Sequence, residues 1–366
     1  MNTPHVKILD RYIIKKFLGT FVFTILIAVL IVIIFDLSEK IDKFLSKQVP
    51  LQEIVFDYYA GFIPWIVNSF SPLFVFISAI FFTSKLAQNS EIVAILSGGI
   101  SFRRLMAPYM FSAGVIALLS LLLGLYVIPP ANQHRLDFEN KYIKTQAIAA
   151  DNMRNIHYQI SPGEFVYVEQ FSRWANTAYR FTLERIENHK IVSKLSAESA
   201  AWDSTNGSWK LKNYYIRDFY GESEVVRTGR QTDTVINLTI DDFYRRKNAV
   251  ESLSEKDLND LIAVQRMRGD ALIKRSLIEK NSRIAMPFSA FVLTIIAVSL
   301  SSRKKRGGLG LNIGIGVGLS FSYILFMRFS QMFVLKDIIP SPALALWIPN
   351  ILFAIVAAIL YRLAPK

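Results

Sequence analysis

The side chains that most often carry out chemistry in proteins are few in this sequence and are scattered along it. There is no cysteine, so disulfides, thiolate nucleophiles and metal sites with cysteine ligands are excluded. The four histidines, His5, His134, His157 and His189, lack ligand spacing, and we interpret them as structural or exposed. The sequence contains neither a Gly-x-Ser-x-Gly nucleophile elbow nor a phosphate-binding loop. We therefore predict no catalytic residue, no metal and no cofactor bound by this chain.

Acidic residues and glycines give no better catalytic site. Carboxylates are numerous between residues 135 and 283, but no motif pairs any two of them, and solvated strand faces account for them. The glycines at 307–318 loosely match a dinucleotide-binding pattern, but they lie in an apolar run without a preceding strand, which favours helix packing. A membrane-embedded enzyme needs clustered polar residues within its spans, and the apolar runs contain no such cluster. Any energy source must therefore come from a partner.

The most distinctive polar stretch covers residues 87–99, which we name the elbow. Its pattern predicts a helix of about two to three turns, in which the Ser90 side chain caps the start and Glu91 lies at the positive end of the helix dipole. Gly98 and Gly99 supply the left-handed residue that ends the helix. Three residues at helical spacing form one apolar face, Ile92, Ile95 and Leu96. Because so short a helix is marginal alone, we expect another protein to cover this face.

The elbow lies between long apolar runs that predict membrane spans. Hydrophobic residues make up 52% of the sequence, and the mean hydropathy is +0.31. Six runs lack Asp, Glu, Lys and Arg: residues 17–35, 58–84, 105–134, 284–302, 307–327 and 338–361. Each can supply the roughly 20 residues that a transmembrane helix needs. We expect span two to be kinked or interrupted at Pro64 and Pro72, and span five to pack closely through Gly310, Gly314 and Gly318.

The distribution of charge predicts the orientation of these spans. The net charge is +13. One alternate set of short loops is basic and includes Arg103, Arg104 and residues 303–306, whereas the opposite set mixes both signs. The positive-inside rule places both termini and the elbow in the cytoplasm. Since the basic residues form no soluble basic face, we expect no nucleic-acid binding.

Between about residues 135 and 283 the pattern changes to short β-rich segments. These are residues 164–169, 180–186, 209–212 and 234–240. Asn206-Gly207 is a strong hairpin turn signal. We predict one β-sandwich or jelly-roll-like domain outside the cytoplasm. A polar helix should follow, starting at a Ser254 capping box and running to about Ser282.

The predicted fold class is thus an α-helical membrane protein with six transmembrane helices and an inserted all-β, jelly-roll-like domain. Residues 1–134 should carry the first three transmembrane helices and the short helix near 88–99. Residues 135–283 should form the β-domain and its connecting helix. Residues 284–366 should carry the last three transmembrane helices.

Two short stretches and this layout together resemble a known family. Residues 8–13 read Ile-Leu-Asp-Arg-Tyr-Ile, and residues 87–93 read Ala-Gln-Asn-Ser-Glu-Ile-Val. With three spans on each side of a β-domain, the chain resembles the lipopolysaccharide-export ABC transporter permeases of the LptF/LptG family. Its Leu-Asp-Arg-Tyr opening is more similar to the LptG members. The resemblance implies a bacterial inner-membrane protein with a periplasmic jelly roll.

The resemblance also implies a function and partners. The chain would be the permease subunit that extracts lipopolysaccharide from the inner membrane and passes it to a periplasmic bridge for export to the outer membrane. An LptB-like cytoplasmic ATPase dimer would bind ATP-Mg, and a paralogous LptF-like permease and an LptC-like single-span periplasmic protein would complete the complex. The elbow would be the coupling helix, with Glu91 paired to an arginine of the ATPase. The candidate coupling residues are Ser90, Glu91, Ile92, Ile95, Leu96 and Gly98.

In that family spans one and five form lateral gates for the lipid. We therefore expect apolar walls made of Ile27, Leu30, Ile31, Ile34, Phe321, Ile324 and Leu325. An anionic head group needs cations near the outer boundary, where a charge costs less than at the bilayer centre. The candidates are Lys40, Lys43 and Arg328, and we favour Arg328 because arginine binds phosphate in a bidentate manner. The alternative is that these residues only anchor helix ends.

A different class of function stays open. The chain could be a non-transport mechanotransmission or sensor membrane protein with an external β-domain and an elbow that signals inward. Such proteins usually have four spans with the large insert after the first. Six spans with the insert after the third favour transport, and a co-purifying ATPase with a second permease would discriminate the two classes.

Overall fold

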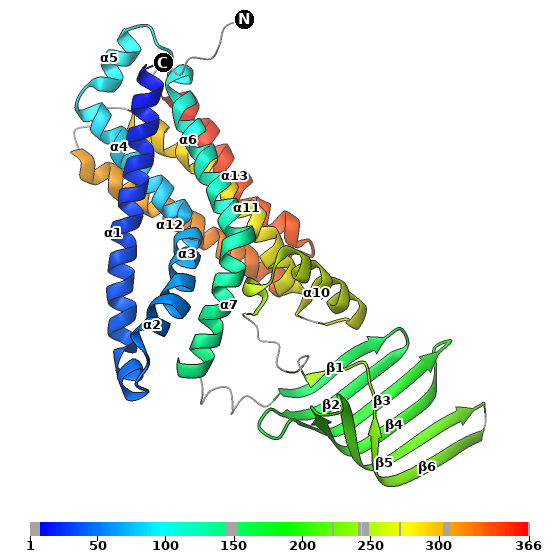
Figure 1. Cartoon of the computed structure of the whole chain (residues 1–366). Coiled ribbons are helices and arrows are strands. Elements are labelled where there is room, and N and C mark those ends of the chain that lie inside the picture. The colour runs from blue at the N-terminus through cyan, green and yellow to red at the C-terminus, as the bar shows by residue number, and fades with distance from the viewer. Residues whose placement is uncertain are drawn as a thin grey trace, which may run out of the picture. The chain divides into compact units, whose positions relative to one another are not determined.

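A computed structural model describes residues 8–143, 153–221, 223–240, 243, 249–270, 272–302 and 308–364. The chain divides into a helical unit of Met1–Arg135 and Leu277–Lys366 and a second unit of Leu136–Ser276 that carries a β-sheet (Figure 1). The predicted fold class is confirmed, because the described residues contain six helices able to cross a membrane and an antiparallel sheet inserted mid-chain. The basic loop predicted at 303–306 lies outside the described residues.

Six long helices provide the candidate spans. They form because uninterrupted apolar residues suit a bilayer, where a helix satisfies all its backbone groups internally. Their bounds are α1 (Ile8–Ser46), α4 (Ser71–Gln88), α6 (Phe102–Leu122), α11 (Ile273–Ser301), α12 (Gly308–Leu335) and α13 (Pro342–Leu363). Helix α6 continues through η2 (Leu123–Val127), α7 (Ile128–Phe138) and η3 (Glu139–Ile143).

The second apolar run is interrupted, as its prolines predict. Helix α2 (Leu51–Glu53) precedes it, and the run itself spans the end of η1 (Ile54–Tyr59), α3 (Ala60–Ser69) and most of α4. The helix breaks at Phe70, and Pro72 lies in the first turn of α4, where its missing N–H costs no helical hydrogen bond. Pro64 lies inside α3.

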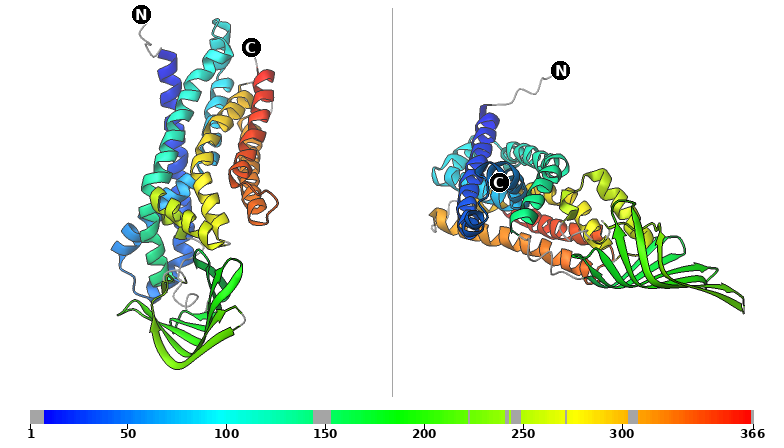
Figure 2. Two further views of the ribbon diagram at one scale, coloured as in Figure 1. Left: turned by 90° about the vertical axis from the view of Figure 1, so that its right-hand side faces the viewer. Right: turned by 60° about the horizontal axis from the view of Figure 1, so that its bottom comes forward.

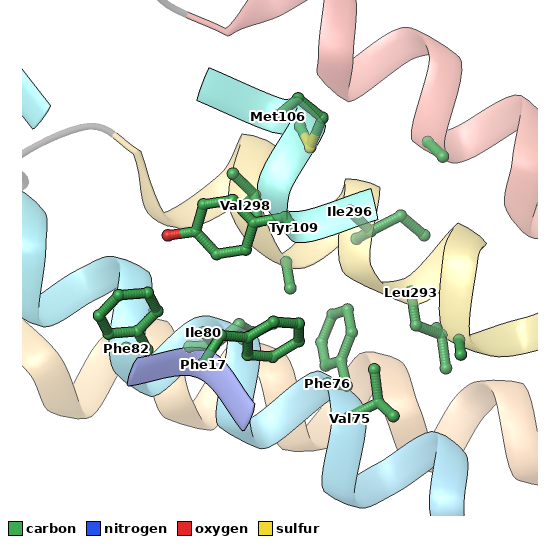
Figure 3. Close-up of a cluster of buried hydrophobic side chains, with 14 of the residues drawn as sticks. Phe17, Val75, Phe76, Ile80, Phe82, Met106, Tyr109, Leu293, Ile296 and Val298 are labelled. Carbon is green, nitrogen blue, oxygen red and sulfur yellow. The ribbon is translucent and has the colours of Figure 1, made fainter. Parts of the chain in front are cut away.

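The core of the helical unit lies where α1, α4, α6 and α11 meet (Figure 3). Phe17, Ile80, Tyr109 and Leu293 are fully buried there. The rings of Phe17 and Tyr109 are 5.6 Å apart. The Thr83 hydroxyl donates a hydrogen bond of 3.1 Å to the Tyr109 hydroxyl, so this buried phenol is not left without a partner.

The prediction that Gly310, Gly314 and Gly318 form the packing face of α12 is wrong for contacts within this chain. Gly310, Gly314 and Gly318 are exposed, and a Cβ added at any of them would meet nothing within 4 Å. The close approach is at Gly316 instead, where a Cβ would overlap the side chain of Ile80 on α4. The four-residue spacing could not show which side of the helix faces α4.

A polar contact joins the last three long helices. The Tyr323 hydroxyl of α12 donates to the Asn350 side-chain oxygen of α13 over 2.9 Å. The Asn350 amide donates in turn to the backbone carbonyl of Ala285 on α11 over 2.8 Å. All three residues are buried. Such bonds fix the packing of helices in lipid, where apolar contacts alone discriminate poorly.

The inserted domain contains one antiparallel sheet of six strands in sequential order. The strands are β1 (Met153–Ser161), β2 (Glu164–Ser172), β3 (Thr177–Glu187), β4 (Lys190–Asp203), β5 (Ser208–Tyr220) and β6 (Ser223–Thr234). The predicted turn at Asn206-Gly207 joins β4 to β5, with Gly207 at a φ of +62°. Asp203 accepts from the Lys210 ammonium and the Thr205 amide, which lower the pKa of Asp203 to about 2.

A row of irregular residues crosses this sheet from edge to edge. Asn155 in β1, Arg180 in β3 and Asn213 in β5 have φ values of +53°, +49° and +47°, and the strand registers skip all three. The same registers skip the residues opposite them, Glu169 in β2 and Glu198 in β4. One residue is skipped on each strand, so the register is kept while the regular strand conformation is interrupted, and the sheet is strongly curved (Figure 2).

The predicted strand at 234–240 is wrong, because β6 ends at Thr234. Residues 235–239 instead are irregular, and Leu238 among them and Phe243 further along the chain are fully buried on the apolar face of the sheet. The Trp209 indole donates to the Leu238 carbonyl over 2.7 Å, and the rings of Phe243 and Phe171 stack 4.1 Å apart. In the described residues this segment, rather than a second sheet, covers the core.

The capping box at Ser254 is confirmed, since its hydroxyl accepts from the Asp257 amide over 3.2 Å. The short helix η4 (Ala249–Ser252) precedes it, and α10 (Glu255–Arg268) follows. Helix α10 ends at Gly269, which has a φ of +63°. The predicted continuous helix to about Ser282 is therefore interrupted before α11 begins.

Candidate functional site

The elbow folds into α5 (Glu91–Ser97), at the end of the helical unit where α1 begins and α13 ends (Figure 1). Its C-terminus forms as predicted, with Gly99 at a φ of +84°. The Ile100 amide donates to the Ile95 carbonyl, and the Gly99 amide donates to the Leu96 carbonyl, which is the Schellman pattern of helix ends. Gly98 itself has an ordinary φ of −75°.

The predicted role of Ser90 as a side-chain cap is wrong. Ser90 has a φ of +59°, and its side chain makes no capping hydrogen bond. This left-handed residue reverses the chain between α4 and α5, and only its backbone carbonyl enters the helix, accepting from the Ala94 amide over 3.0 Å. The sequence gives no sign of this conformation, because serine rarely adopts it.

The apolar face of α5 is turned toward the chain's own core. Ile92 is 1% exposed and belongs to the cluster formed by the long helices, and Ile95 and Leu96 pack against that cluster. The expectation that another protein covers this face is therefore wrong for Ile92, whereas Ile95 and Leu96 are only partly buried, and a role for them in coupling stays a prediction. The outward face carries Val93, which is 53% exposed, and Ser97.

Glu91 is held at the first turn of α5 by two neutral donors. The Tyr12 hydroxyl of α1 donates to its Oε2 over 3.1 Å, and the Asn89 amide donates to its Oε1 over 3.2 Å. The carboxylate remains partly exposed, and no cation pairs with it among the described residues. A negative charge here also complements the N-terminus of the helix.

A second contact lies beside it and was not predicted. Arg104, at the start of α6, donates from Nη1 and Nη2 to the two carboxylate oxygens of Asp10 over 2.7 and 2.5 Å. Sequence reasoning named both residues, Asp10 within the Leu-Asp-Arg-Tyr stretch and Arg104 as a basic flank, but nothing in their spacing pairs them. Residues from α1, α5 and α6 thus meet at one end of the helical unit.

At the other end of α1, Lys40 is enclosed by the chain itself. Its ammonium contacts the Asp36 carboxylate and the Tyr58 hydroxyl, and it lies 4.8 Å from the centre of the Tyr58 ring and 5.6 Å from that of Phe62. The Tyr58 and Tyr59 hydroxyls also donate to Asp36 over 3.0 and 3.3 Å. Lys40 is thus already neutralised and hydrogen-bonded.

The other two predicted cations are placed differently. Lys43 is exposed on α1, and Arg328 is exposed on α12, where it donates to the Gln331 side chain over 3.2 Å. The structure does not gather the three cations into one described cluster. It leaves Arg328 and Lys43 available to a ligand, while Lys40 has internal partners.

The predicted apolar walls are mostly exposed. Exposed side chains on α1 are Ile27, Leu30, Ile31 and Ile34, and on α12 they are Phe321 and Leu325. Ile324 differs, because it is partly buried against the core. Both helices pack against α4. Their exposed sides form two apolar surfaces, which suit contact with lipid or with another apolar helix.

No group of three or more His, Cys, Asp or Glu residues in the described part of the chain could hold a metal ion. The arrangement offers instead a surface helix with one oriented carboxylate, and exposed apolar helices. These features suit binding to a partner or to lipid.

Comparison with known proteins fits this arrangement. A family model described as "Lipopolysaccharide export system permease LptF/LptG" matches residues 11–363. The chain is similar to the lipopolysaccharide export system permease protein LptG of Haemophilus influenzae, with 23% identity over 298 residues that cover 80% of this chain and 81% of the relative. It is also 23% identical to LptG of Escherichia coli K12 over 303 residues, which cover 80% of each.

Proposed function

The chain belongs to the lipopolysaccharide export system permease family LptF/LptG, and from this premise we propose that it is the LptG-type permease subunit of an ABC transporter. In this proposal it extracts lipopolysaccharide from the bacterial inner membrane and passes it to a periplasmic bridge for export to the outer membrane. Members of the family are multi-pass membrane proteins that serve as non-catalytic transporter subunits. ATP hydrolysis must therefore occur in a partner.

The proposed energy source is an LptB-like cytoplasmic ATPase dimer that binds ATP-Mg and docks on the elbow. The observation that carries this proposal is the presentation of Glu91 on α5. The carboxylate is oriented by two neutral donors, and the helix below it is anchored through Ile92. A partner cation can therefore approach an acid whose position is already fixed, and the outward residues Val93 and Ser97 would lie beside it.

The proposed lipid path uses the exposed apolar surfaces of α1 and α12. A paralogous LptF-like permease and an LptC-like single-span protein are the proposed neighbours, and exposed apolar side chains such as Leu30, 61% exposed, suit contact with lipid or with their helices. Arg328 is proposed to meet the anionic head group, and Lys43 to assist. Lys40 is a weaker candidate, because Asp36 already neutralises it.

The test of this function is purification in mild detergent with mass spectrometry of the bound proteins and lipids. The wild-type chain should recover an ATPase, a second permease and a phosphorylated glycolipid. Glu91→Lys should lose the ATPase, because leaving a buried partner cation unpaired costs about 2–5 kcal/mol. Glu39→Lys, at an exposed position near the other end of α1, is the matched control and should keep it.

Two outcomes would count against the proposal in different ways. If the purified wild-type chain carries a sensor kinase and no ATPase, the result would favour signalling over transport. Glu91→Lys that retains the ATPase at wild-type yield would leave the transport function in place and reduce Glu91 to a residue that merely starts a helix.

A further inference from the structure

The contacts at the start of α1 point to a role for two residues that do not belong to the docking helix. We propose that Tyr12 and Asp10 are positioning residues that join α1 to the elbow and to the start of α6, which follows the elbow in the chain, so that movement of the elbow is delivered to α1. This inference rests on the proposed docking of an ATPase at α5. It adds the route by which force leaves that helix.

The first part of the joint is a bidentate ion pair. Both carboxylate oxygens of Asp10 accept from the two terminal nitrogens of Arg104. The Asp10 side chain is 14% exposed and that of Arg104 is 39% exposed, so the pair is partly shielded from water. A planar fork-to-fork pair fixes orientation as well as distance. It therefore holds the first turns of α1 and α6 in one arrangement, and α6 begins directly after the elbow in the chain.

The second part is the contact between Tyr12 and Glu91. Tyr12 lies on α1 and donates to one carboxylate oxygen of Glu91, while Asn89, beside the helix, donates to the other. The carboxylate is thus oriented partly by α1. Since a phenol brings no charge of its own, it orients Glu91 without neutralising it. Any displacement of Glu91 by a docked partner acts directly on α1.

Apolar packing supports the polar contacts. Ile13 and Phe17 of α1 are fully buried and belong to the same cluster as Ile92 of α5 and Phe102 of α6. Between Phe17 and Phe44, by contrast, no side chain of α1 is buried in the described structure. The start of α1 is therefore the place where this helix is firmly connected to the elbow.

The test uses the complete complex with its ATPase, reconstituted in proteoliposomes. The variants are Asp10→Asn, Arg104→Ala, Tyr12→Phe and the exchange Asp10→Arg with Arg104→Asp. The measurements are ATP hydrolysis, lipopolysaccharide released per ATP, ATPase recovery and the melting temperature. Arg11→Ala and Arg103→Ala, which change exposed neighbouring cations, are the matched controls.

We expect Asp10→Asn and Arg104→Ala to keep the ATPase bound and to lower lipid released per ATP about tenfold, the size expected for one charge-assisted pair. Tyr12→Phe should have a smaller effect in the same direction. The charge exchange should recover most of the release, and the two controls should match wild type.

Two results would overturn the inference. The first is that the Asp10→Asn and Tyr12→Phe proteins keep both the melting temperature of the wild type and its amount of lipopolysaccharide released per ATP. The other is a loss of release that only parallels a lowered melting temperature and is not recovered by the exchange, which would make the pair purely structural. Failure of wild-type chain to bind any ATPase is a separate result that rejects the proposed function itself.

Discussion

Two carboxylates near the opposite ends of α1 are held by tyrosine hydroxyls, Glu91 by Tyr12 and Asp36 by Tyr58 and Tyr59. The difference between them is the cation. Lys40 already lies beside Asp36, whereas the described residues offer none to Glu91. The carboxylate of Glu91 near the start of α1 is thus available to a cation from a partner. The ammonium of Lys40 near the other end is already paired within the chain.

Residues of this kind were only partly predictable. The helix end at Gly99 could be predicted because glycine is the usual left-handed residue there. The left-handed Ser90 and the Asp10–Arg104 pair could not, because neither a rare backbone conformation nor a contact across 94 residues leaves a local pattern. The spacing of Asp36 and Lys40 already suits a helical ion pair, whereas the contact between Lys40 and Tyr58, 18 residues apart, is evident only in three dimensions.

Arg328 supports a prediction about the lipid. Arg328→Ala should lower photocrosslinking of lipopolysaccharide to α1 and α12 roughly tenfold, since one charge-assisted contact is lost. Arg328→Lys should lose less, because lysine keeps the charge without the bidentate geometry. Recovery of the ATPase should not change, as the elbow lies at the other end of the bundle. Unchanged crosslinking in both Arg328→Ala and Lys43→Ala would mean that apolar contacts or another subunit hold the lipid.

At the scale of elements, spans were easier to predict than strands. A run of some 20 apolar residues leaves little alternative to a membrane helix, and all six were found. The strands were harder because the irregular residues with positive φ break the alternation. Inward-facing residues come three apart there, as at Ala178 and Phe181 in β3 or Ala197 and Ala200 in β4, and in β5 the buried Leu211 is followed by the partly buried Tyr214. A search for period two therefore misses much of the sheet.

The irregular segment after β6 gives the prediction at this scale. Phe243→Ala should destabilise the β-domain by about 3–5 kcal/mol, the range for removing a buried aromatic ring, because Phe243 packs against Phe171, Tyr158 and Trp209. Hydrogen exchange of the full chain in detergent should then be faster in β1, β2 and β5. Val235→Ala, at an 83% exposed position, is the control. Equal protection in Phe243→Ala would show that this segment does not complete the core.

The whole molecule consists of three membrane spans, the β-domain and three more membrane spans, in that order along the chain. Composition alone predicts this layout, because long charge-free runs and short β-rich segments occupy separate parts of the sequence. Composition cannot specify which faces of the helices meet. The glycine face of α12 shows this limit, since the residue that packs closely is Gly316 and not its neighbours in the four-residue series.

Orientation in the membrane gives the prediction for the whole chain. Because the sequence has no cysteine, single substitutions Ser97→Cys and Ser204→Cys report on single sites. Both positions are exposed, one on α5 and one in the turn after β4. In spheroplasts an impermeant thiol reagent should label position 204 and not 97, as the positive-inside rule predicts. Equal labelling, or labelling of position 97 alone, would reverse or reject this topology.

Helix α1 has 39 residues, which makes it about 58 Å long, roughly twice the thickness of the hydrocarbon layer. Its buried side chains are Ile13 and Phe17 near the start and Phe44 near the end. A rod held near both ends connects the two sites. A movement at the docking helix would therefore reach the contacts around Asp36 and Lys40 through one continuous helix that is longer than the hydrocarbon layer is thick.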